Sequence, residues 1–343
     1  MIRIGIICPS EIAFRRFLPA LKLYSEFQFM GIAIASSEEW HGSSASYDQQ
    51  IEEDRVRRER DKACQFIKEY GSGQIFNSYT DLVSSDLVDV VYLPLPPALH
   101  YKWTKLAVMN GKHTFVEKPF TTDFSDAKEL IELARLKNVA LYENYMFIYH
   151  NQLQAVNDVV KSGEIGDVRL YRITFGFPRK AANDFRYNKS LGGGALIDAG
   201  GYTIKYASSL LGSKARLTTA NLNFIPEFDV DVYGTATMIN EQGVTAQLAF
   251  GMDCDYRCDI EIWGSQGTIT SNRILTAPSG FVPEYTVKKN QCYETRPLPS
   301  DDAFSKSISY FKSCIIDVET REMEFSNIYR ESELLDQFIK LAK

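Results

Sequence analysis

The sequence has no long uninterrupted run of apolar residues and no excess of basic residues. No stretch approaches the ~18 consecutive apolar residues that a membrane span needs, and the apolar run at the N-terminus is too short for a signal peptide. Lys and Arg number 38 against 44 Asp and Glu, which gives a formal charge of −6. We therefore expect neither nucleic acid nor a membrane as a partner, and we expect a cytoplasmic protein.

Cysteine and histidine are also scarce. Six cysteines in 343 residues are too few to indicate a disulfide framework. The closest pair, Cys254 and Cys258, has no histidine or further cysteine near enough to complete a zinc site, so no metal is expected. All four histidines lie within the first 150 residues, and the second half of the chain therefore cannot supply a histidine as a catalytic base.

The pattern of apolar residues divides the chain into two parts. Residues 2–7, 29–35, 88–93 and 113–116 are predicted strands without polar alternation, and helical segments separate them. Such an order predicts a parallel, doubly wound sheet. After about residue 150, apolar and polar residues alternate, for example over 244–250, as in an antiparallel sheet with one buried face.

The predicted fold class is therefore α/β, with a Rossmann dinucleotide-binding domain over 1–122. The remainder, 123–343, is predicted to form a second α/β domain with a large, mostly antiparallel sheet, for substrate binding and oligomerisation. The helix and strand expected within 123–145 fit either domain. The mixed-charge segment 52–62 is interpreted as a solvated helix face, although it is also the only segment that would suggest a partner-binding module.

A dinucleotide-binding loop is expected after the first strand, where glycines normally allow close approach of a pyrophosphate to a helix N-terminus. The glycine spacing survives here only as Cys8-x-Ser10-x-x-Ala13, and these residues by themselves favour an ordinary strand-to-helix loop. At the end of the second strand, Ser36 and Ser37 stand where NAD-binding proteins carry an acidic residue. The missing carboxylate favours NADP over NAD, although no arginine follows these serines.

Three later segments together resemble the Gfo/Idh/MocA family of NAD(P)-dependent oxidoreductases. They are Tyr92-Leu93-Pro94-Leu95-Pro96-Pro97-Ala98-Leu99-His100, Gly111-Lys112-His113-Thr114-Phe115-Val116-Glu117-Lys118-Pro119 and Gly192-Gly193-Gly194-Ala195-Leu196-Ile197-Asp198-Ala199-Gly200-Gly201-Tyr202. The resemblance follows the family's order over nearly the whole chain. A tyrosine as the last residue of the third segment is similar to the branch that contains glucose-fructose oxidoreductase and dimeric dihydrodiol dehydrogenase.

The chemistry of alcohol oxidation can be assigned to the same residues. The reaction needs hydride transfer to a nicotinamide and removal of a hydroxyl proton. Asp198 and Tyr202 are four residues apart at a predicted helix start and share a face. A phenol with an ordinary pKa of ~10 needs a nearby cation to act near neutrality, and Lys118 follows a predicted parallel strand. Each residue also has a structural interpretation: a helix cap, a core aromatic and a surface lysine.

The resemblance implies a role for each candidate residue. Lys118, Asp198 and Tyr202 would be catalytic, with Tyr202 as the acid/base, Lys118 lowering the pKa of that phenol and Asp198 orienting the substrate. Tyr145 and Arg186 would contact or orient the substrate. The residues expected to bind NADP or NAD are Cys8, Ser10, Glu11, Ile12, Ser36, Ser37, Leu95, Pro96, His100, Glu117 and Lys118.

The predicted protein is thus an NAD(P)-dependent enzyme that interconverts a secondary alcohol and a ketone on a sugar, polyol or nucleotide sugar. Family membership also implies a homodimer or homotetramer formed through the open face of the second sheet. The alternative is a cofactor-binding sensor or scaffold of the same fold that has lost catalysis, which the altered Cys8-Pro9-Ser10 loop motivates.

Overall fold

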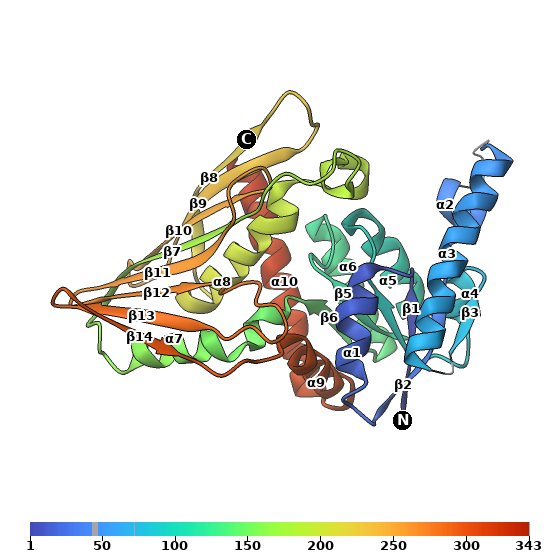
Figure 1. The fold of residues 1–343 in the computed structure, drawn as a ribbon, viewed down its shortest axis with the longest axis horizontal. Coiled ribbons are helices and arrows are strands. Elements are labelled where there is room, and N and C mark those ends of the chain that lie inside the picture. Colours follow the sequence, from blue (N-terminus) through green and yellow to red (C-terminus); the bar gives the residue numbers. More distant parts are fainter. Residues whose placement is uncertain (43–46, 72, 343) are drawn as a thin grey trace. The chain divides into compact units, whose positions relative to one another are not determined.

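The computed structural model describes residues 1–42, 47–71 and 73–342, which form two compact units (Figure 1). The first unit contains Met1–Thr121, Ser125–Asn144 and Ile308–Ser326. The second contains Thr122–Phe124, Tyr145–Ser307 and the chain from Asn327 onward. Most of the segment 123–145, which fits either predicted domain, lies in the first unit, and this unit also includes 308–326 from the part of the chain assigned to the second domain.

The first unit is built on a parallel sheet of six strands in the order β3-β2-β1-β4-β5-β6, which confirms the predicted Rossmann sheet. The strands are β1 (Ile2–Ile7), β2 (Phe27–Ala33), β3 (Gln74–Phe76), β4 (Val90–Leu93), β5 (His113–Glu117) and β6 (Leu141–Asn144). The helices are η1 (Ala13–Phe17), α1 (Leu18–Leu21), α2 (Ser37–His41), α3 (Gln49–Tyr70), α4 (Tyr79–Ser84), η2 (Pro97–Leu99), α5 (His100–Met109) and α6 (Phe124–Lys137). β6 belongs here because it pairs with β5 along its length.

Aromatic residues fill the core of this unit. The ring of Phe115 on β5 lies 5.2 Å from Phe17, 5.3 Å from Tyr92 and 4.7 Å from Tyr142. Phe311, on the long helix α9 (Ala303–Ile316), closes the same cluster at 5.2 Å. Continuous apolar strands thus bury both faces of the sheet, as the absence of polar alternation predicted.

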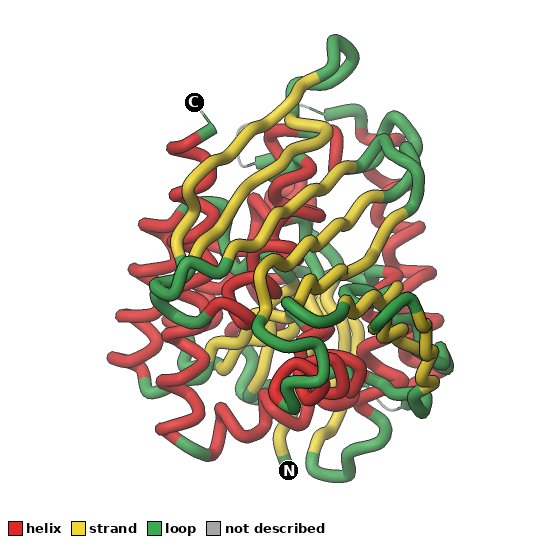
Figure 2. The backbone as a smooth tube through the Cα atoms, turned by 90° about the vertical axis from the view of Figure 1, so that its left-hand side faces the viewer, coloured by secondary structure: helices red, strands yellow, loops and turns green. Residues whose placement is uncertain are grey.

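The second unit contains a sheet of eight strands in the order β14-β13-β12-β11-β7-β10-β9-β8. The strands are β7 (Val168–Gly176), β8 (Arg216–Phe224), β9 (Asp231–Ile239), β10 (Thr245–Gly251), β11 (Arg257–Gly264), β12 (Thr268–Asn272), β13 (Glu284–Lys289) and β14 (Cys292–Pro297). The helical segments are η3 (Met146–Tyr149), α7 (Asn151–Lys161), η4 (Phe185–Tyr187), η5 (Lys189–Leu191), η6 (Leu196–Gly200), α8 (Gly201–Leu211) and α10 (Val318–Leu341). Figure 2 shows these strands side by side; β7 and β10 pair in parallel, and the other pairs are antiparallel.

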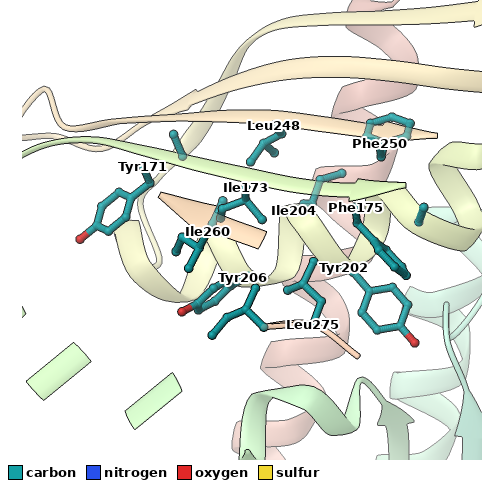
Figure 3. Packing of buried hydrophobic residues seen from close by; sticks show 14 of the residues in the cluster. Tyr171, Ile173, Phe175, Tyr202, Ile204, Tyr206, Leu248, Phe250, Ile260 and Leu275 are labelled. Atoms are coloured by element: carbon teal, nitrogen blue, oxygen red, sulfur yellow. The ribbon is translucent and has the colours of Figure 1, made fainter. Parts of the chain in front are cut away.

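One face of this sheet is apolar. On β10, Ala246, Leu248 and Phe250 are buried and alternate with more exposed neighbours. The helix α8 packs against β7 and β10, and its Tyr202, Ile204 and Tyr206 join the apolar cluster (Figure 3). The predicted alternation therefore sets which residues the helix covers. In the described part of the chain, no helix is both long enough and apolar enough to cross a bilayer.

Candidate active site

The loop after β1 keeps the backbone of a glycine loop although it carries a cysteine. Cys8 has φ of +76°, a left-handed conformation that glycine adopts readily and other residues adopt rarely. The Cys8 N–H donates to the Ala33 carbonyl on β2 at 3.1 Å, which fixes the loop against the sheet. Burial raises the pKa of the Cys8 thiol to about 11, so the thiol remains protonated near neutrality.

A helix begins directly after this loop. The Ser10 hydroxyl accepts a hydrogen bond from the Ala13 N–H at 3.3 Å and thereby caps the helix. The first turn of a helix leaves N–H groups without helical acceptors, and here that turn includes Glu11 and Ile12. A helix N-terminus at the carboxyl end of β1 fits the pyrophosphate of a dinucleotide, and the contact of these residues with the cofactor stays a prediction.

Ser36 and Ser37, the predicted cofactor residues after β2, are both engaged in hydrogen bonds. Ser36 caps α2 in a capping box with Glu39. The Ser37 hydroxyl donates to the Glu52 carboxylate on α3 at 2.6 Å. Arg55 forms two hydrogen bonds with the same carboxylate, at 2.8 and 2.6 Å, and a third with the Ala35 carbonyl at 3.0 Å.

This network corrects the interpretation of segment 52–62 as a solvated helix face. Glu52 and Arg55 are 5% and 7% exposed, so the segment contributes a buried ion pair beneath the end of β2. The helical spacing of Glu52, Arg55 and Glu59 turns these charges to one side of α3, where Arg55 lies 2.6 Å from Glu52 and 3.1 Å from Glu59. A count of charged residues in a sequence does not show which of them pair with one another and become buried.

The loop after β4 contains the predicted cofactor residues Leu95, Pro96 and His100. His100 is fully buried, and its ring nitrogens lie 2.7 Å from the Pro119 carbonyl and 2.8 Å from the Leu95 carbonyl. Burial lowers the pKa of His100 to about 4, and a neutral imidazole carries one N–H, so it donates to one of these two carbonyls. His100 thus lies between the loop after β4 and the loop after β5, and its contact with the cofactor stays a prediction.

Glu117 supports the backbone next to Lys118. Its carboxylate accepts hydrogen bonds from the Tyr92 hydroxyl at 2.7 Å and from the Asn144 side-chain amide at 2.8 Å. Burial raises the pKa of Glu117. The Lys118-Pro119 peptide bond that follows is cis. Sequence reasoning missed Tyr92 and Asn144, since only strand pairing brings β4 and β6 to either side of β5.

In the second unit, three aromatic rings hold Tyr202. Tyr145 and Phe175 lie 5.2 Å from its ring and Phe147 lies 5.5 Å away. Figure 3 shows the Tyr202 hydroxyl directed away from the other labelled side chains. Tyr145 is fully buried, and a Cβ on Gly201 would lie 2.1 Å from its hydroxyl oxygen. Tyr145 therefore packs against the Tyr202 ring, and its contact with substrate stays a prediction.

Asp198 lies on η6, a π-helical turn that continues into α8. Single π-helical turns occur frequently at functional sites. Arg186 donates from Nε to the Asp198 carboxylate at 2.7 Å and from Nη1 to Asp184 at 3.0 Å. The two carboxylates hold the guanidinium in place. Arg186 and Asp198 are thus brought together in the second unit.

Asp231, at the start of β9, is a further residue of this site that the sequence did not indicate. Its carboxylate accepts the Leu196 N–H at 2.7 Å, at the beginning of η6. Gly194 precedes that turn with φ of +122°, and a Cβ there would lie 2.4 Å from the Asp231 Oδ1 atom. Glycine is therefore required at position 194, because the Asp231 carboxylate occupies the space of a side chain.

Among the described residues, no group of three or more His, Cys, Asp or Glu side chains could hold a metal ion. The first unit carries a Rossmann sheet with a helix N-terminus at the carboxyl end of β1, which is typical of a dinucleotide-binding domain. The second unit carries Tyr202 and the Asp198 carboxylate that pairs with Arg186. A dinucleotide-binding domain is a feature of nicotinamide-dependent oxidoreductases.

Comparison with protein families agrees with this conclusion. Residues 30–145 match the oxidoreductase family model with an NAD-binding Rossmann fold, and residues 153–270 match a Gfo/Idh/MocA C-terminal domain. The chain belongs to the Gfo/Idh/MocA family of oxidoreductases. The predicted family, fold class and enzyme class are thereby confirmed.

The similar proteins are more specific than the family. The chain is 36% identical to a dTDP-3,4-didehydro-2,6-dideoxy-alpha-D-glucose 3-reductase of Actinomadura kijaniata, over 98% of this chain and 94% of that protein. It is 34% identical to a reductase of the same name from Streptomyces violaceoruber, over 92% and 85%.

Among solved structures, the chain resembles KijD10, a 3-ketoreductase from Actinomadura kijaniata in complex with NADP and TDP-benzene. The TM-score is 0.88 at 35% identity, over 99% of this chain and 97% of that one. KijD10 has also been solved with the same ligands as two variants, one with a tyrosine replaced by phenylalanine and one with a lysine replaced by alanine.

Proposed function

We propose that this chain is an NADPH-dependent ketoreductase that reduces a ketone on a deoxysugar linked to deoxythymidine diphosphate. Support comes from relatives of that activity that align over nearly the whole chain, and from a similar structure that binds NADP and a TDP compound. Family membership alone would allow a sugar, a polyol or a nucleotide sugar as the substrate. The proposal narrows this range to a ketone on a nucleotide-linked sugar.

The observation that carries the proposal is the spacing of two residues. The lysine and tyrosine replaced in the KijD10 variants are 84 positions apart, and so are Lys118 and Tyr202. Lys118 follows the supported strand β5, and Tyr202 presents its hydroxyl at the edge of an aromatic cluster. We propose that both residues serve one nicotinamide ring and one substrate carbonyl.

The proposed reduction divides the work between the cofactor and the chain. Bound NADPH supplies the hydride that the carbonyl carbon receives. The Tyr202 hydroxyl donates its proton to the carbonyl oxygen, which yields the alcohol and leaves a phenolate that takes up a proton from water. The Lys118 ammonium group stabilises the negative charge on oxygen. Asp198, held by Arg186, accepts a hydrogen bond from a sugar hydroxyl and orients the ring.

The interpretation as a sensor without catalysis is not favoured. It rested on the altered Cys8-Pro9-Ser10 loop, but Cys8 keeps the positive φ of a glycine and Ser10 caps the following helix. The cytoplasmic location stays a prediction. The homodimer or homotetramer also stays a prediction, and light scattering in solution measures the mass of the oligomer.

Reduction of a nucleotide-linked ketosugar tests the proposed function directly. We expect loss of NADPH absorbance with a dTDP-linked 3-ketosugar and far slower loss with the same ketosugar lacking the nucleotide. Binding of NADPH measured by nicotinamide fluorescence, with no oxidation of NADPH by any dTDP-linked ketosugar, would instead support the sensor. Equal rates with and without the nucleotide would contradict the proposed substrate class while leaving the oxidoreductase intact.

A further inference from the structure

A groove of about 690 Å³ lies beside the end of β2 in the first unit, between α3 and the start of α2. Its lining includes Ser37, Glu52, Glu53, Val56, Arg57 and Arg60. In open parallel sheets, ligands bind outside the carboxyl ends of the strands, and the second strand receives the adenosine ribose of a dinucleotide. Figure 1 shows α2 and the N-terminal part of α3 extending past the strand ends of this sheet. The groove is thus positioned for the ribose end of the cofactor.

The carboxylate in this groove is not available to bind a ribose hydroxyl. Glu52 accepts two hydrogen bonds from Arg55, one from Ser37 at 2.6 Å and one from His41 at 2.9 Å. These four contacts occupy the lone pairs of a carboxylate. The hydrogen bonds from Arg55 lower the pKa of Glu52 to about 2, and the Arg55 guanidinium compensates its charge. Glu52 therefore differs from the acidic residue that selects NAD.

Two arginines, Arg57 and Arg60, also line the groove. Arg57 pairs with Asp54 at 2.7 Å, whereas Arg60 donates to the neutral side-chain oxygen of Asn77 at 2.9 Å. Arg57 and Arg60 are three residues apart and share a helix face. Both are exposed, so a ligand can reach them.

Position along α3 separates Arg60 from Glu53, the other acidic residue of the groove. Asn77 directly follows β3, and Glu59 accepts the Ala35 N–H after β2 at 3.3 Å, so this part of α3 is level with the strand ends. Glu53 lies seven residues before Arg60, or ~10 Å further out along the helix axis. The charge beside the end of β2 is therefore that of Arg60 rather than that of Glu53.

We infer that Arg60, assisted by Arg57, is the specificity-determining residue that binds the 2'-phosphate of NADP(H) in this groove. The inference rests on the proposed function and identifies the cation that was not found next to Ser36 and Ser37 in the sequence. A guanidinium binds phosphate through two parallel hydrogen bonds and leaves the 2'-hydroxyl of NAD(H) without a comparable partner. The chain thus selects NADP(H) through an arginine of α3 that lies 23 residues after Ser37 in the sequence.

The test compares two arginines of one helix. Arg60→Gln removes the proposed contact, and Arg58→Gln removes the same charge from an exposed residue that does not line the groove. Nicotinamide fluorescence titration gives the Kd of each variant for NADPH and for NADH. Isothermal titration with 2',5'-ADP and with 5'-AMP isolates the 2'-phosphate without the nicotinamide. Thermal unfolding checks that each variant folds.

We expect Arg60→Gln to weaken NADPH and 2',5'-ADP binding about tenfold or more, with NADH and 5'-AMP changed less than about twofold. Arg57→Gln added to Arg60→Gln should weaken NADPH further, and Arg58→Gln should leave every Kd unchanged. Equal weakening of NADPH and NADH, or no weakening of either, would overturn the assignment of Arg60. If the unaltered protein binds neither nucleotide, the proposed function itself fails.

Discussion

Replacing Tyr202 with phenylalanine is expected to lower kcat for ketone reduction about a hundredfold or more, with little change in the Kd for NADPH. A positioned general acid contributes typically about 10²–10⁴ in rate, and phenylalanine removes the proton donor only. The ring contacts with Tyr145, Phe147 and Phe175 stay in place, so the fold of the second unit should be unaffected. Steady-state kinetics and NADPH titration measure the two quantities.

Tyr206 provides the matched control. It lies one turn further along α8, is fully buried and packs against Phe147 at 6.0 Å. Its side chain is buried and burial raises its pKa, so the hydroxyl keeps its proton near neutrality and is not accessible to a substrate. Tyr206→Phe should therefore retain kcat. A Tyr202→Phe variant that turns over every accepted substrate at the original rate would remove this tyrosine from the mechanism, whereas loss of activity in both variants would indicate a packing effect.

Gly194→Ala is expected to lower both stability and turnover. The φ of +122° at Gly194 disfavours any side chain, and strain of this kind costs about 1–3 kcal/mol. The new Cβ would also displace the Asp231 carboxylate, and breaking its hydrogen bond to Leu196 costs about another 1–3 kcal/mol. Because the displaced turn carries Asp198, kcat should fall together with the free energy of unfolding. Denaturant titration and kinetics on the same samples measure both.

A double-mutant cycle separates the two causes. In an Asp231→Ala background the carboxylate is absent, so Gly194→Ala retains the backbone strain but meets no carboxylate. The two substitutions should then couple by about 0.5–3 kcal/mol, with the double variant more stable than the sum of the single effects predicts. Strict additivity would show that Asp231 does not restrict position 194. A Gly212→Ala variant is the comparison, since Gly212 has φ of +89° with open space around it.

Local patterns predicted the elements more reliably than they predicted contacts. The strand Ile2–Ile7 and the helix ending at Gly212 lie where the apolar periodicity and the glycine put them. The same rules placed segment 52–62 on a helix but expected it to be solvated. Helical spacing identifies which charges share a face, but whether that face is covered depends on which segment packs over it.

Contacts between residues that lie far apart in the sequence are likewise not predicted by local patterns. Asp198 and Arg186 are twelve residues apart, and the resemblance suggested both, yet only the structure shows that they form an ion pair. Asp231 carries no motif and is 35 residues from Leu196, whose N–H it accepts. Tyr92 and Asn144 reach Glu117 because β4 and β6 flank β5 in the sheet. A strand order of this kind is a property of the whole sheet.

The amino-acid sequence by itself determined the two-part α/β architecture, the oxidoreductase family and the order of the lysine, aspartate and tyrosine along the chain. The architecture follows from periodicity, which is a local property of a polypeptide, whereas the family and the roles of these three residues follow from the resemblance of three segments. Only the tertiary structure shows that the Glu52 carboxylate accepts hydrogen bonds from Arg55 and that the side chains of Tyr145 and His100 are buried. It also shows that Asp231 accepts a hydrogen bond from the turn that carries Asp198. Side chains acquire such roles only when burial removes water as their alternative hydrogen-bond partner, and burial is set by segments remote in the chain.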